Sequence, residues 1–433
     1  MQKKKKTAAL VWFRNDLRVR DQHSLSNAIA KHKQVIGLYH IPKEWLLPTP
    51  WGFKKMERYR AKFLLQTLMQ LKKELEKINI SLLVTVGNWA ESIATVQKNY
   101  AVSDVYGQKE WTQEEVEQEQ QLPNILTTHW CYDQFLYHPE DIPMELSTLP
   151  EVFTVFRKKC EKQAIVREPI PAPEAMPDEN VLTSVPEFPT LKKLGYEEFE
   201  ADSRTAIPFV GGESAAWARV QTYFWETKQL SYYKQTRNGL LGDKYSSKLS
   251  LWLAFGSISP RAIYAEVKNY ERDIIKNSST YWLIFELIWR DYFKYISRKH
   301  GNNIFKLGGI LSKEYEWNTD LRKLNKWIAG NTPEPFVNAN MIELAATGFM
   351  SNRGRQNVAS FFAKGWKMDW RMGAAYFESM LIDYDVHSNY GNWMYNAGVG
   401  NDPRDRQFNI AWQAARYDAN GTYQKTWLQK TLF

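Results

Sequence analysis

A short stretch near the C-terminus, DYDVHSNYGNWMY, brings together several side chains that could take part in chemistry. Asp383 and Asp385 supply two carboxylates, His387 an imidazole, Asn389 an amide and Trp393 an indole. This segment is too polar for a core strand and too aromatic for an ordinary surface turn. It is therefore either a capped loop between helices or one wall of a binding site.

A second segment, YSSKLSLWLAFGSISP, places three hydroxyls and a lysine just before an apolar helix. Ser246, Ser247 and Ser250 are suited to capping that helix, which is the usual role of serine at a helix start. Hydroxyls, free backbone amides and Lys248 together also favour a phosphate-binding site. Both interpretations stay open on the sequence alone.

A third candidate is the pair Glu286 and Trp289 in YWLIFELIWRDYF, which share one face of a predicted helix. A glutamate among so many apolar residues must be paired, face a cavity or carry a proton. One interpretation is an ion pair with a nearby arginine. The other is a pocket in which a base stacks on the indole and is hydrogen-bonded by the carboxyl group.

The segment GFMSNRGRQN adds Asn352, Arg353, Arg355 and Gln356. Its two arginines are suited to phosphate contacts or to ion pairs with the carboxylates of the C-terminal stretch. We expect at least one of them to form a structural ion pair.

Composition sets limits on the class of protein. The net charge of +9 suits a polyanionic partner, although Lys3 to Lys6, an expected solvated tail, supply four charges and 9 − 4 leaves +5. Two cysteines predict neither a disulfide framework nor a cysteine zinc site, and no metal site is predicted. No window reaches the length of a membrane span, and the apolar run after the lysines stops at Arg14. We expect a soluble, cytoplasmic protein.

The elements that position these residues fall into two patterns. Within residues 7–130 the runs AALVWF, QVIGLYH, ISLLVTV and VSDVYG read as strands that alternate with helical patterns, and NILTTHW is a candidate for a fifth strand. One helix carries Leu64, Leu68, Leu71, Leu75 and Ile78 on one face. This alternation predicts a doubly wound parallel sheet wrapped by helices. The first strand is followed by no G-x-G-x-x-G, so a nicotinamide fingerprint is absent.

The remaining chain changes character twice. Prolines punctuate a stretch from about 160 to 210 that has little periodicity and reads as a long surface connector. From residue 211 onward helical patterns dominate, for example at 214–228 and 261–271. The predicted organisation is an α/β domain at 1–135, a linker at 136–210 and an all-helical domain at 211–433.

These motifs carry a family resemblance. WFRNDLRVRD, YSSKLSLWLAFGSISP, ELIWRDYF, SNRGRQN and DYDVHSNYGNWMY follow one another in the order found in the photolyase/cryptochrome family. More narrowly, YKQTRNGLLGDKYSSKLS and SNYGNWMYNAGVGNDPR look like the DASH cryptochromes. The resemblance implies an α/β antenna domain, a linker and a helical domain that binds a U-shaped FAD.

The resemblance also implies roles for particular residues. Asn389 matches the residue that faces flavin N5, where an amide offers no acidic proton and favours a fully reduced anionic flavin. Trp393, Trp370 and Trp317 match a tryptophan relay that carries electrons from the protein surface to the flavin. The positions that match flavin-binding residues are Tyr233, Ser246, Ser247, Lys248, Leu249, Ser250, Arg290, Arg355, Asp383, Asp385 and Asn389.

The implied substrate is a cyclobutane pyrimidine dimer. Glu286, Trp289, Asn352 and Arg353 match residues that meet a dimer flipped out of the helix. Repair of (6-4) lesions uses two histidines in the SNRGRQN region, where this chain has Asn352 and Gln356. That activity is therefore not expected.

Two departures from ordinary dimer photolyases concern the pocket wall. Gln356 replaces a methionine and Tyr395 a second tryptophan, which makes the pocket more polar and weakens stacking. Stacking is worth ~1–3 kcal/mol per base, and flipping out of a duplex costs a few kcal/mol. The sequence thus predicts light-driven repair preferentially in single-stranded DNA, as in the DASH pattern.

Other partners and roles complete the prediction. Glu110 in GQKEWTQEE matches the carboxylate that holds a 5,10-methenyltetrahydrofolate antenna, and the alternative is an exposed residue before a helix. RNA is a second nucleic-acid partner left open, and we expect a monomer without membrane contact. The alternative function is a blue-light photoreceptor, a signalling cryptochrome that binds nucleic acid.

Overall fold

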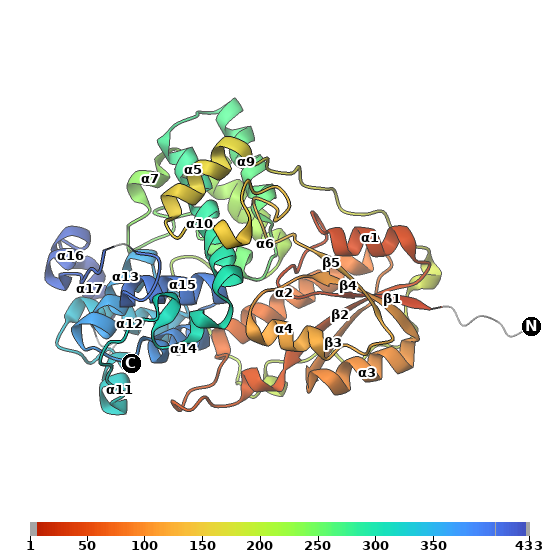
Figure 1. The fold of residues 1–433 in the computed structure, drawn as a ribbon, viewed down its shortest axis with the longest axis horizontal. Coiled ribbons are helices and arrows are strands. Elements are labelled where there is room, and N and C mark those ends of the chain that lie inside the picture. The colour runs from red at the N-terminus through yellow and green to blue at the C-terminus, as the bar shows by residue number, and fades with distance from the viewer. Residues whose placement is uncertain (1–6, 403, 430–433) are drawn as a thin grey trace, which may run out of the picture.

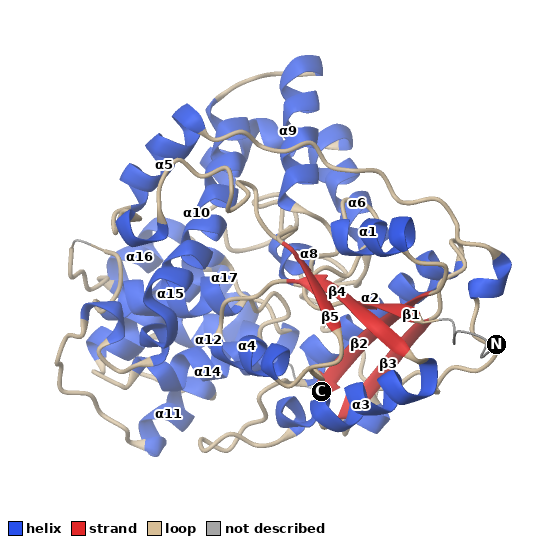
Figure 2. Ribbon diagram, turned by 45° about the vertical axis from the view of Figure 1, so that its right-hand side comes forward, coloured by secondary structure: helices blue, strands red, loops and turns tan. Residues whose placement is uncertain are grey.

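The computed structural model describes residues 7–402 and 404–429, so the lysine run at Lys3 to Lys6 lies outside the described residues. An α/β domain and a helical domain lie next to each other, and the strands gather in the first of them (Figure 1). Figure 2 shows the strands of this sheet crossing the α/β domain, with helices around them.

The sheet has the strand order β3-β2-β1-β4-β5, and every neighbouring pair is parallel. Its strands are β1 (Ala8–Trp12), β2 (Val35–Pro42), β3 (Leu82–Gly87), β4 (Val102–Gln108) and β5 (Thr127–Cys131). The predicted parallel sheet with helices is therefore confirmed. The order reverses between β1 and β4, and open α/β sheets bind ligands beyond the carboxyl ends of strands at such a switch point.

Helices cover both faces of the sheet because side chains alternate along each strand. Ala9, Val11 and Phe13 join the core that includes α2 (Arg58–Glu76). Leu10 and Trp12 point to the other face, where Trp12 stacks on Trp89 of α3 (Trp89–Tyr100) at a centroid distance of 4.3 Å.

The predicted leucine face belongs to α2. Leu64, Leu68, Leu71 and Leu75 are buried, as the helical spacing predicts. Ile78 lies beyond the last residue of this helix, in the turn that leads to β3, and is half-buried.

The helical domain is built around one long helix, α10 (Ser278–His300), which begins with a capping box between Asn277 and Thr280. It contacts α5, α7, α9 and α15. The remaining helices are α1 (His23–Lys31), α4 (Gln113–Gln120), α5 (Phe153–Gln163), α6 (Glu213–Val220), α7 (Tyr233–Thr236), α8 (Ser250–Ala254), α9 (Pro260–Asp273), α11 (Leu321–Ile328), α12 (Pro335–Thr347), α13 (Asn352–Ser360), α14 (Trp370–Met380), α15 (Val386–Ala397), α16 (Ile410–Tyr417) and α17 (Thr422–Leu428).

Buried charges join the two domains. Arg261 at the start of α9 pairs with Asp21 at 2.7 Å and with Asp133 at 2.9 Å, and each of the three side chains is at most 3% exposed. Arg18, after β1, donates to the carbonyl oxygen of Gly256 at 2.8 Å. Separating the two domains here would leave uncompensated buried charges, which is energetically costly.

The interval predicted as a linker contains one regular helix, α5, which packs against α10. The chain after α5 runs over the α/β domain, where the Asn180 side chain exchanges two hydrogen bonds with the backbone of Val35, at 2.8 and 3.0 Å. Among residues 7–402 and 404–429, no helix is long and apolar enough to cross a membrane.

Candidate functional site

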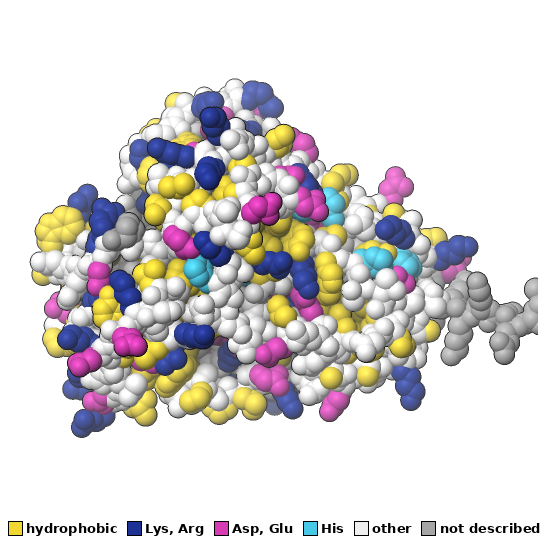
Figure 3. All heavy atoms as spheres, in the orientation of Figure 1, with side chains coloured by type: hydrophobic (Ala, Val, Ile, Leu, Met, Phe, Trp, Pro, Cys, Tyr) yellow, Lys and Arg dark blue, Asp and Glu magenta, His cyan; other side chains and the backbone are white. Residues whose placement is uncertain are grey.

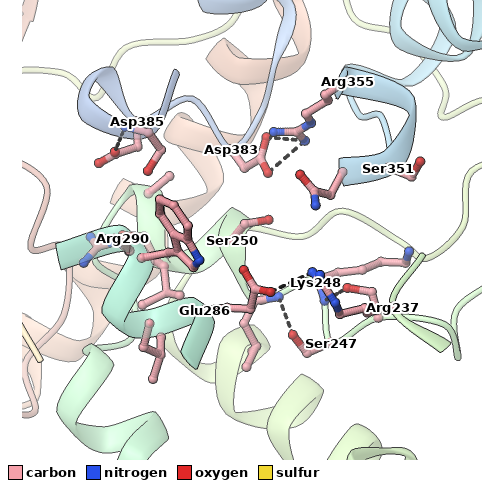
Figure 4. Close-up of a pocket in the computed structure, with 18 of the residues that line it drawn as sticks. Arg237, Ser247, Lys248, Ser250, Glu286, Arg290, Ser351, Arg355, Asp383 and Asp385 are labelled. Atoms are coloured by element: carbon pink, nitrogen blue, oxygen red, sulfur yellow. Dashed lines mark hydrogen bonds and ion pairs between the residues drawn. The ribbon is translucent and has the colours of Figure 1, made fainter. Parts of the chain in front are cut away.

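A cavity of about 440 Å³ opens in the helical domain, between α10, α13, the start of α15 and the segment before α8. Fifteen residues singled out in the sequence line it: Tyr233, Ser246, Ser247, Lys248, Leu249, Ser250, Glu286, Trp289, Arg290, Asn352, Arg355, Gln356, Asp383, Asp385 and Tyr395. In Figure 4 the labelled lining residues, among them Lys248, Glu286 and Asp383, reach the space from several elements. The tertiary structure thus brings together segments that lie far apart in the sequence.

One wall carries an ion pair between Arg355 of α13 and Asp383, which precedes α15. Arg355 Nη2 lies 2.9 and 3.0 Å from the two carboxylate oxygens, and the Asp383 side chain is 2% exposed (Figure 4). Arg355 Nε also donates to the carbonyl oxygen of Met350 at 2.9 Å. The arginine is therefore fixed in place, and the predicted structural ion pair is present.

Asp385 fixes the start of α15. Its side chain caps the helix by accepting from the backbone N–H of Ser388 at 2.8 Å, and Lys294 of α10 lies 3.2 Å from its other oxygen. Burial raises its pKa, but the nearby positive charges of Lys294 and Arg290 and the helix-capping bond hold the pKa far below the ordinary value. Asp385 is thus a permanent negative charge at the cavity edge.

The serine segment does not act as a helix cap. Helix α8 begins at Ser250, and Leu249 precedes it without any side-chain capping bond. The hydroxyls of Ser246 and Ser247 form only long hydrogen bonds, of 3.4 and 3.5 Å, with the backbone N–H groups two residues further on. The cap alternative is therefore wrong, and the hydroxyls face the cavity.

Lys248 lies in the middle of this segment and is 2% exposed. Its backbone is in the left-handed region with φ +56°, which costs an L-residue about 1–2 kcal/mol. Its ammonium group has no hydrogen-bond partner and lies 3.5 Å from the ring centre of Tyr245. Burial lowers the pKa of Lys248 to about 7. An unpaired buried ammonium group that faces a cavity is suited to an anionic ligand.

The opposite wall holds Glu286 and Trp289. Arg237 Nη1 binds Glu286 at 2.6 Å, so the predicted ion pair with an arginine is present, and the carboxyl side chain, 30% exposed, also lines the cavity. Burial raises the pKa of Glu286, against the lowering effect of Arg237. Trp289 stacks on Phe153 of α5 at 3.6 Å and meets Tyr395 edge-on at 6.4 Å. One face of the indole is therefore already covered.

The predicted substrate residues of α13 divide into two groups. Asn352 and Gln356 line the cavity, and the Gln356 carbonyl oxygen is buried without a partner. Arg353 lines no described cavity wall; it donates to Asn238 at 2.9 Å and lies over the ring of Tyr417 at 4.6 Å. The structure therefore separates Arg353 from the other substrate candidates.

Comparison with known proteins agrees with this arrangement. Residues 9–174 match the family described as DNA photolyase, and residues 282–431 match the FAD binding domain of DNA photolyase. The chain is 46% identical over 427 residues to Cryptochrome DASH of Gloeobacter violaceus, a match that spans 97% of this chain and 85% of that protein. The chain belongs to the photolyase/cryptochrome family. Its resemblance to the DASH cryptochromes is thereby confirmed.

Other relatives support the same assignment. Cryptochrome DASH of Arabidopsis thaliana is 42% identical, over 99% of this chain and 77% of that protein. The crystal structure of a Synechocystis cryptochrome has a TM-score of 0.93 and 44% identity, covering 98% of this chain and 88% of that one. A class III photolyase from Agrobacterium tumefaciens, at 24% identity and a TM-score of 0.83, shows the fold alone.

The donor set of the cavity fits the FAD expected of this family. Lys248 and the hydroxyls of Ser246, Ser247 and Ser250 are suited to phosphate oxygens, and the unpartnered Lys248 ammonium group lacks such an acceptor. Asp385 offers a carboxylate to hydroxyl and N–H donors. Arg290 also lines the cavity, and its guanidinium group donates to the carbonyl oxygens of Gln134 and Leu253 at 2.5 and 3.1 Å. These hydrogen bonds fix the cavity wall at this point.

Asn389 lines a smaller neighbouring cavity that shares Asn352, Arg355, Asp383 and Asp385 with the main one. Its Nδ2 donates to the carbonyl oxygen of Ala374 at 2.9 Å, which leaves Oδ1 free to accept a hydrogen bond. Trp393, one turn further along α15, lines the same smaller cavity.

The three tryptophans predicted to form a relay differ in burial: Trp393 and Trp370 are buried and Trp317 is half-buried. Trp393 is 2% exposed and packs on Gly373, which lies one turn after Trp370 on α14. Trp370 is fully buried and donates to the carbonyl oxygen of Leu307. Trp317 is half-buried, and its neighbour Asn318 forms a parallel bridge to the residues that precede α14.

Glu110 lies just beyond the carboxyl end of β4, at the switch point of the sheet. The alternative of an exposed residue is wrong, because Glu110 is 3% exposed. Gln108 donates to it at 2.6 Å, and His387 Nε2 of α15 lies 4.0 Å away. Hydrogen bonding by His387 and the charges of Lys294 and Arg14 lower the pKa of Glu110 to about 2 against the effect of burial.

Sequence reasoning missed several residues that form this site. Arg237, which follows α7, binds Glu286 of α10, and Lys294 pairs with Asp385. His387, which had no assigned part, meets the α/β domain at Glu110. Arg237 lies in the segment YKQTRNGLLG and Lys294 lies five residues after Trp289. No local sequence pattern indicated that these residues pair with Glu286 and Asp385.

On the face drawn in Figure 3, Lys and Arg side chains lie interspersed with Asp and Glu. The net charge of +9 is therefore not gathered into one basic stripe on this face.

Proposed function

We propose that the chain repairs cyclobutane pyrimidine dimers in a light-driven, FAD-dependent reaction, preferentially in single-stranded DNA. One observation carries the proposal: Glu286 and Trp289 line the same cavity as Lys248 and the Arg355–Asp383 pair. A carboxyl and an indole suited to a nucleobase therefore lie within one space with groups suited to a dinucleotide cofactor. The family membership supports DNA as the partner.

In this proposal FAD, when bound and reduced, supplies and recovers the electron that splits the dimer under blue light. Lys248 and the hydroxyls of Ser246, Ser247 and Ser250 bind the phosphates, and Tyr233 and Leu249 complete that wall. The buried Arg355–Asp383 pair and Asp385 orient the ring system. Asn389 accepts a hydrogen bond through Oδ1 and offers no acidic proton.

Glu286 acts on the dimer. Arg237 holds its carboxyl group at 2.6 Å from one side, and burial raises its pKa, which favours the protonated form that donates a hydrogen bond. Such a donor, directed at a dimer carbonyl, stabilises negative charge that develops there. Photolyases are among the standard examples of base flipping, so extrusion of the dimer into the cavity follows that precedent.

The preference for single strands follows from the pocket wall. Tyr395 meets Trp289 edge-on and Gln356 presents a carbonyl oxygen that lacks a partner, so the wall is more polar than one built from a methionine and a second tryptophan. Phe153 already covers one face of Trp289. Reduced stacking of ~1–3 kcal/mol per base is comparable to the few kcal/mol needed to extrude a dimer from a duplex.

We also propose a folate antenna at Glu110, and domain limits near residues 135 and 210. The antenna proposal is supported by the position of Glu110 at the switch point of the sheet. The side-chain carbonyl oxygens of Gln108 and Gln134 and Nδ1 of His387 are buried without partners, so groups that could bond a pterin ring are present. Glu110 would bind the amino edge of that ring.

The decisive experiment illuminates the reduced protein with dimer-containing single strands and with the matching duplex. We expect repair of the single strands and little repair of the duplex. Glu286→Ala should lower single-strand repair, whereas Glu151→Gln should not, because Glu151 is a glutamate paired with Lys299 outside the cavity.

Each alternative result has a distinct meaning. Absence of single-strand repair by the wild-type protein would exclude the proposed enzyme and favour the photoreceptor function. Equal repair of both substrates would refute the argument from Gln356 and Tyr395, and full activity of Glu286→Ala would refute the role of Glu286.

A further inference from the structure

A fourth tryptophan touches the innermost member of the relay. Trp327 of α11 lies edge-on to Trp393, with a centroid distance of 6.2 Å and an interplanar angle of 72°. It is fully buried and shares contacts with Phe362 and Phe377, which also pack against Trp393. Trp327 is not a member of the Trp393–Trp370–Trp317 relay, yet its ring is in direct contact with the start of that relay.

The surroundings of Trp327 suit reversible electron transfer. The indole nitrogens of Trp327 and Trp393 are both buried and without a hydrogen-bond partner. An oxidised indole in this position has no neighbouring base to take its proton, so it stays a cation and can accept an electron again. Trp370 differs because its indole nitrogen donates to the carbonyl oxygen of Leu307.

Aromatic contacts continue from Trp327 into the other domain. Tyr376 of α14 lies 5.8 Å from Trp327, Phe53 lies 5.3 Å from Tyr376, and Trp51 lies 6.2 Å from Phe53. Phe53 and Trp51 belong to a hairpin of the α/β domain that is closed by a bridge between residues 48 and 54. Trp51 is half-buried, so the series ends at the protein surface.

We propose that Trp327 is a second electron donor to Trp393, and that Tyr376, Phe53 and Trp51 connect it to the surface of the α/β domain. One electron passes from the Trp327 indole to the Trp393 radical cation, and one passes from Trp51, across Tyr376 and Phe53, to Trp327. No bond breaks in either transfer. The Trp51 radical cation loses its indole proton to water, and a thiol in solution reduces it by giving up one electron and one proton, after which two thiyl radicals form a disulfide.

The inference rests on the proposed FAD site and on Trp393 as its electron donor, and the test separates the two. Wild-type holoprotein, Trp370→Phe and Trp370→Phe/Trp327→Phe are illuminated with a thiol, and flavin reduction and transient tryptophan radicals are recorded by absorption. Wild-type protein that shows neither signal would exclude the relay itself. We expect Trp370→Phe to keep measurable reduction and a tryptophan radical, and the double variant to lose at least 10-fold of both.

A matched control and a surface variant complete the design. Trp370→Phe/Trp12→Phe removes a buried tryptophan of the α/β core instead and should behave like Trp370→Phe. Trp370→Phe/Trp51→Phe alters a half-buried position. Because the electron hole then stays on Trp327 and recombines with the flavin, this variant should lower the yield of stably reduced flavin, as omission of the thiol does. Equal signals in Trp370→Phe and in both of its Trp327 and Trp51 derivatives would overturn the proposal, as would complete loss of signal in Trp370→Phe alone.

Discussion

The Arg355–Asp383 ion pair allows a prediction that separates stability from cofactor binding. Arg355→Ala leaves the Asp383 carboxylate, 2% exposed, without the guanidinium group that now lies 2.9 Å away. Removing one partner of a buried ion pair costs ~3–5 kcal/mol. Because the Arg355 side chain is itself 24% exposed, water partly reaches the site and we expect the lower end, ~3 kcal/mol. This corresponds to roughly a 100-fold change in the unfolding equilibrium.

The double variant Arg355→Ala/Asp383→Ala removes the stranded charge together with its partner. We therefore expect it to be more stable than Arg355→Ala, with a coupling free energy of ~2 kcal/mol in the double-mutant cycle. The measurement is the urea midpoint of unfolding of the flavin-free proteins, with tryptophan fluorescence as the signal. Flavin content after purification is measured in parallel, and we expect it to be low in Arg355→Ala, in Asp383→Ala and in the double variant.

Two results would refute this reasoning. If the costs of Arg355→Ala and Asp383→Ala simply add in the double variant, the two side chains are not coupled. If the double variant recovers both stability and flavin, the pair serves the fold and not the cofactor.

Three further outcomes are expected. Burial lowers the pKa of Lys248 from 10.5 to about 7, so between these pH values the unfolded chain binds more protons than the flavin-free folded protein. The stability of the wild-type protein, measured by urea midpoints, should therefore rise with pH in this range by up to ~1.4 kcal/mol per pH unit relative to Lys248→Met. Identical pH slopes of the two proteins would contradict this prediction. Gln356→Met/Tyr395→Trp should raise the initial rate of duplex repair roughly 5- to 150-fold and leave single-strand repair little changed, because stacking is worth ~1–3 kcal/mol per base. An unchanged rate of duplex repair would contradict the proposal that Gln356 and Tyr395 limit repair in a duplex. Gly373→Ala places a methyl group against the Trp393 ring, so it should cost ~1–3 kcal/mol in chemical unfolding and slow flavin photoreduction while flavin content is kept.

Local sequence patterns were sufficient for the fold. Each strand of the sheet is a short apolar run, and the period of the leucines in α2 matches the helix that forms. These signals are local because a strand or helix face must be apolar wherever it is buried. The pattern failed at element ends, as at Ile78, where the hydrophobic period continues past the last helical residue into a turn, and it missed helix α5 within the predicted linker.

The sequence by itself also determined which residues are candidates for the site. Family motifs placed Lys248, Glu286, Asp383 and Asp385 on the list, and the fold brings them to one cavity.

Only the tertiary structure decided the partners of these residues. Arg237 is 49 residues from Glu286, and His387 meets Glu110 across the boundary between the domains. Trp327 reaches Trp393 from another helix. Such contacts leave no periodic trace in the chain, because they depend on how whole helices and domains pack, whereas periodicity reports only which side of each element is buried.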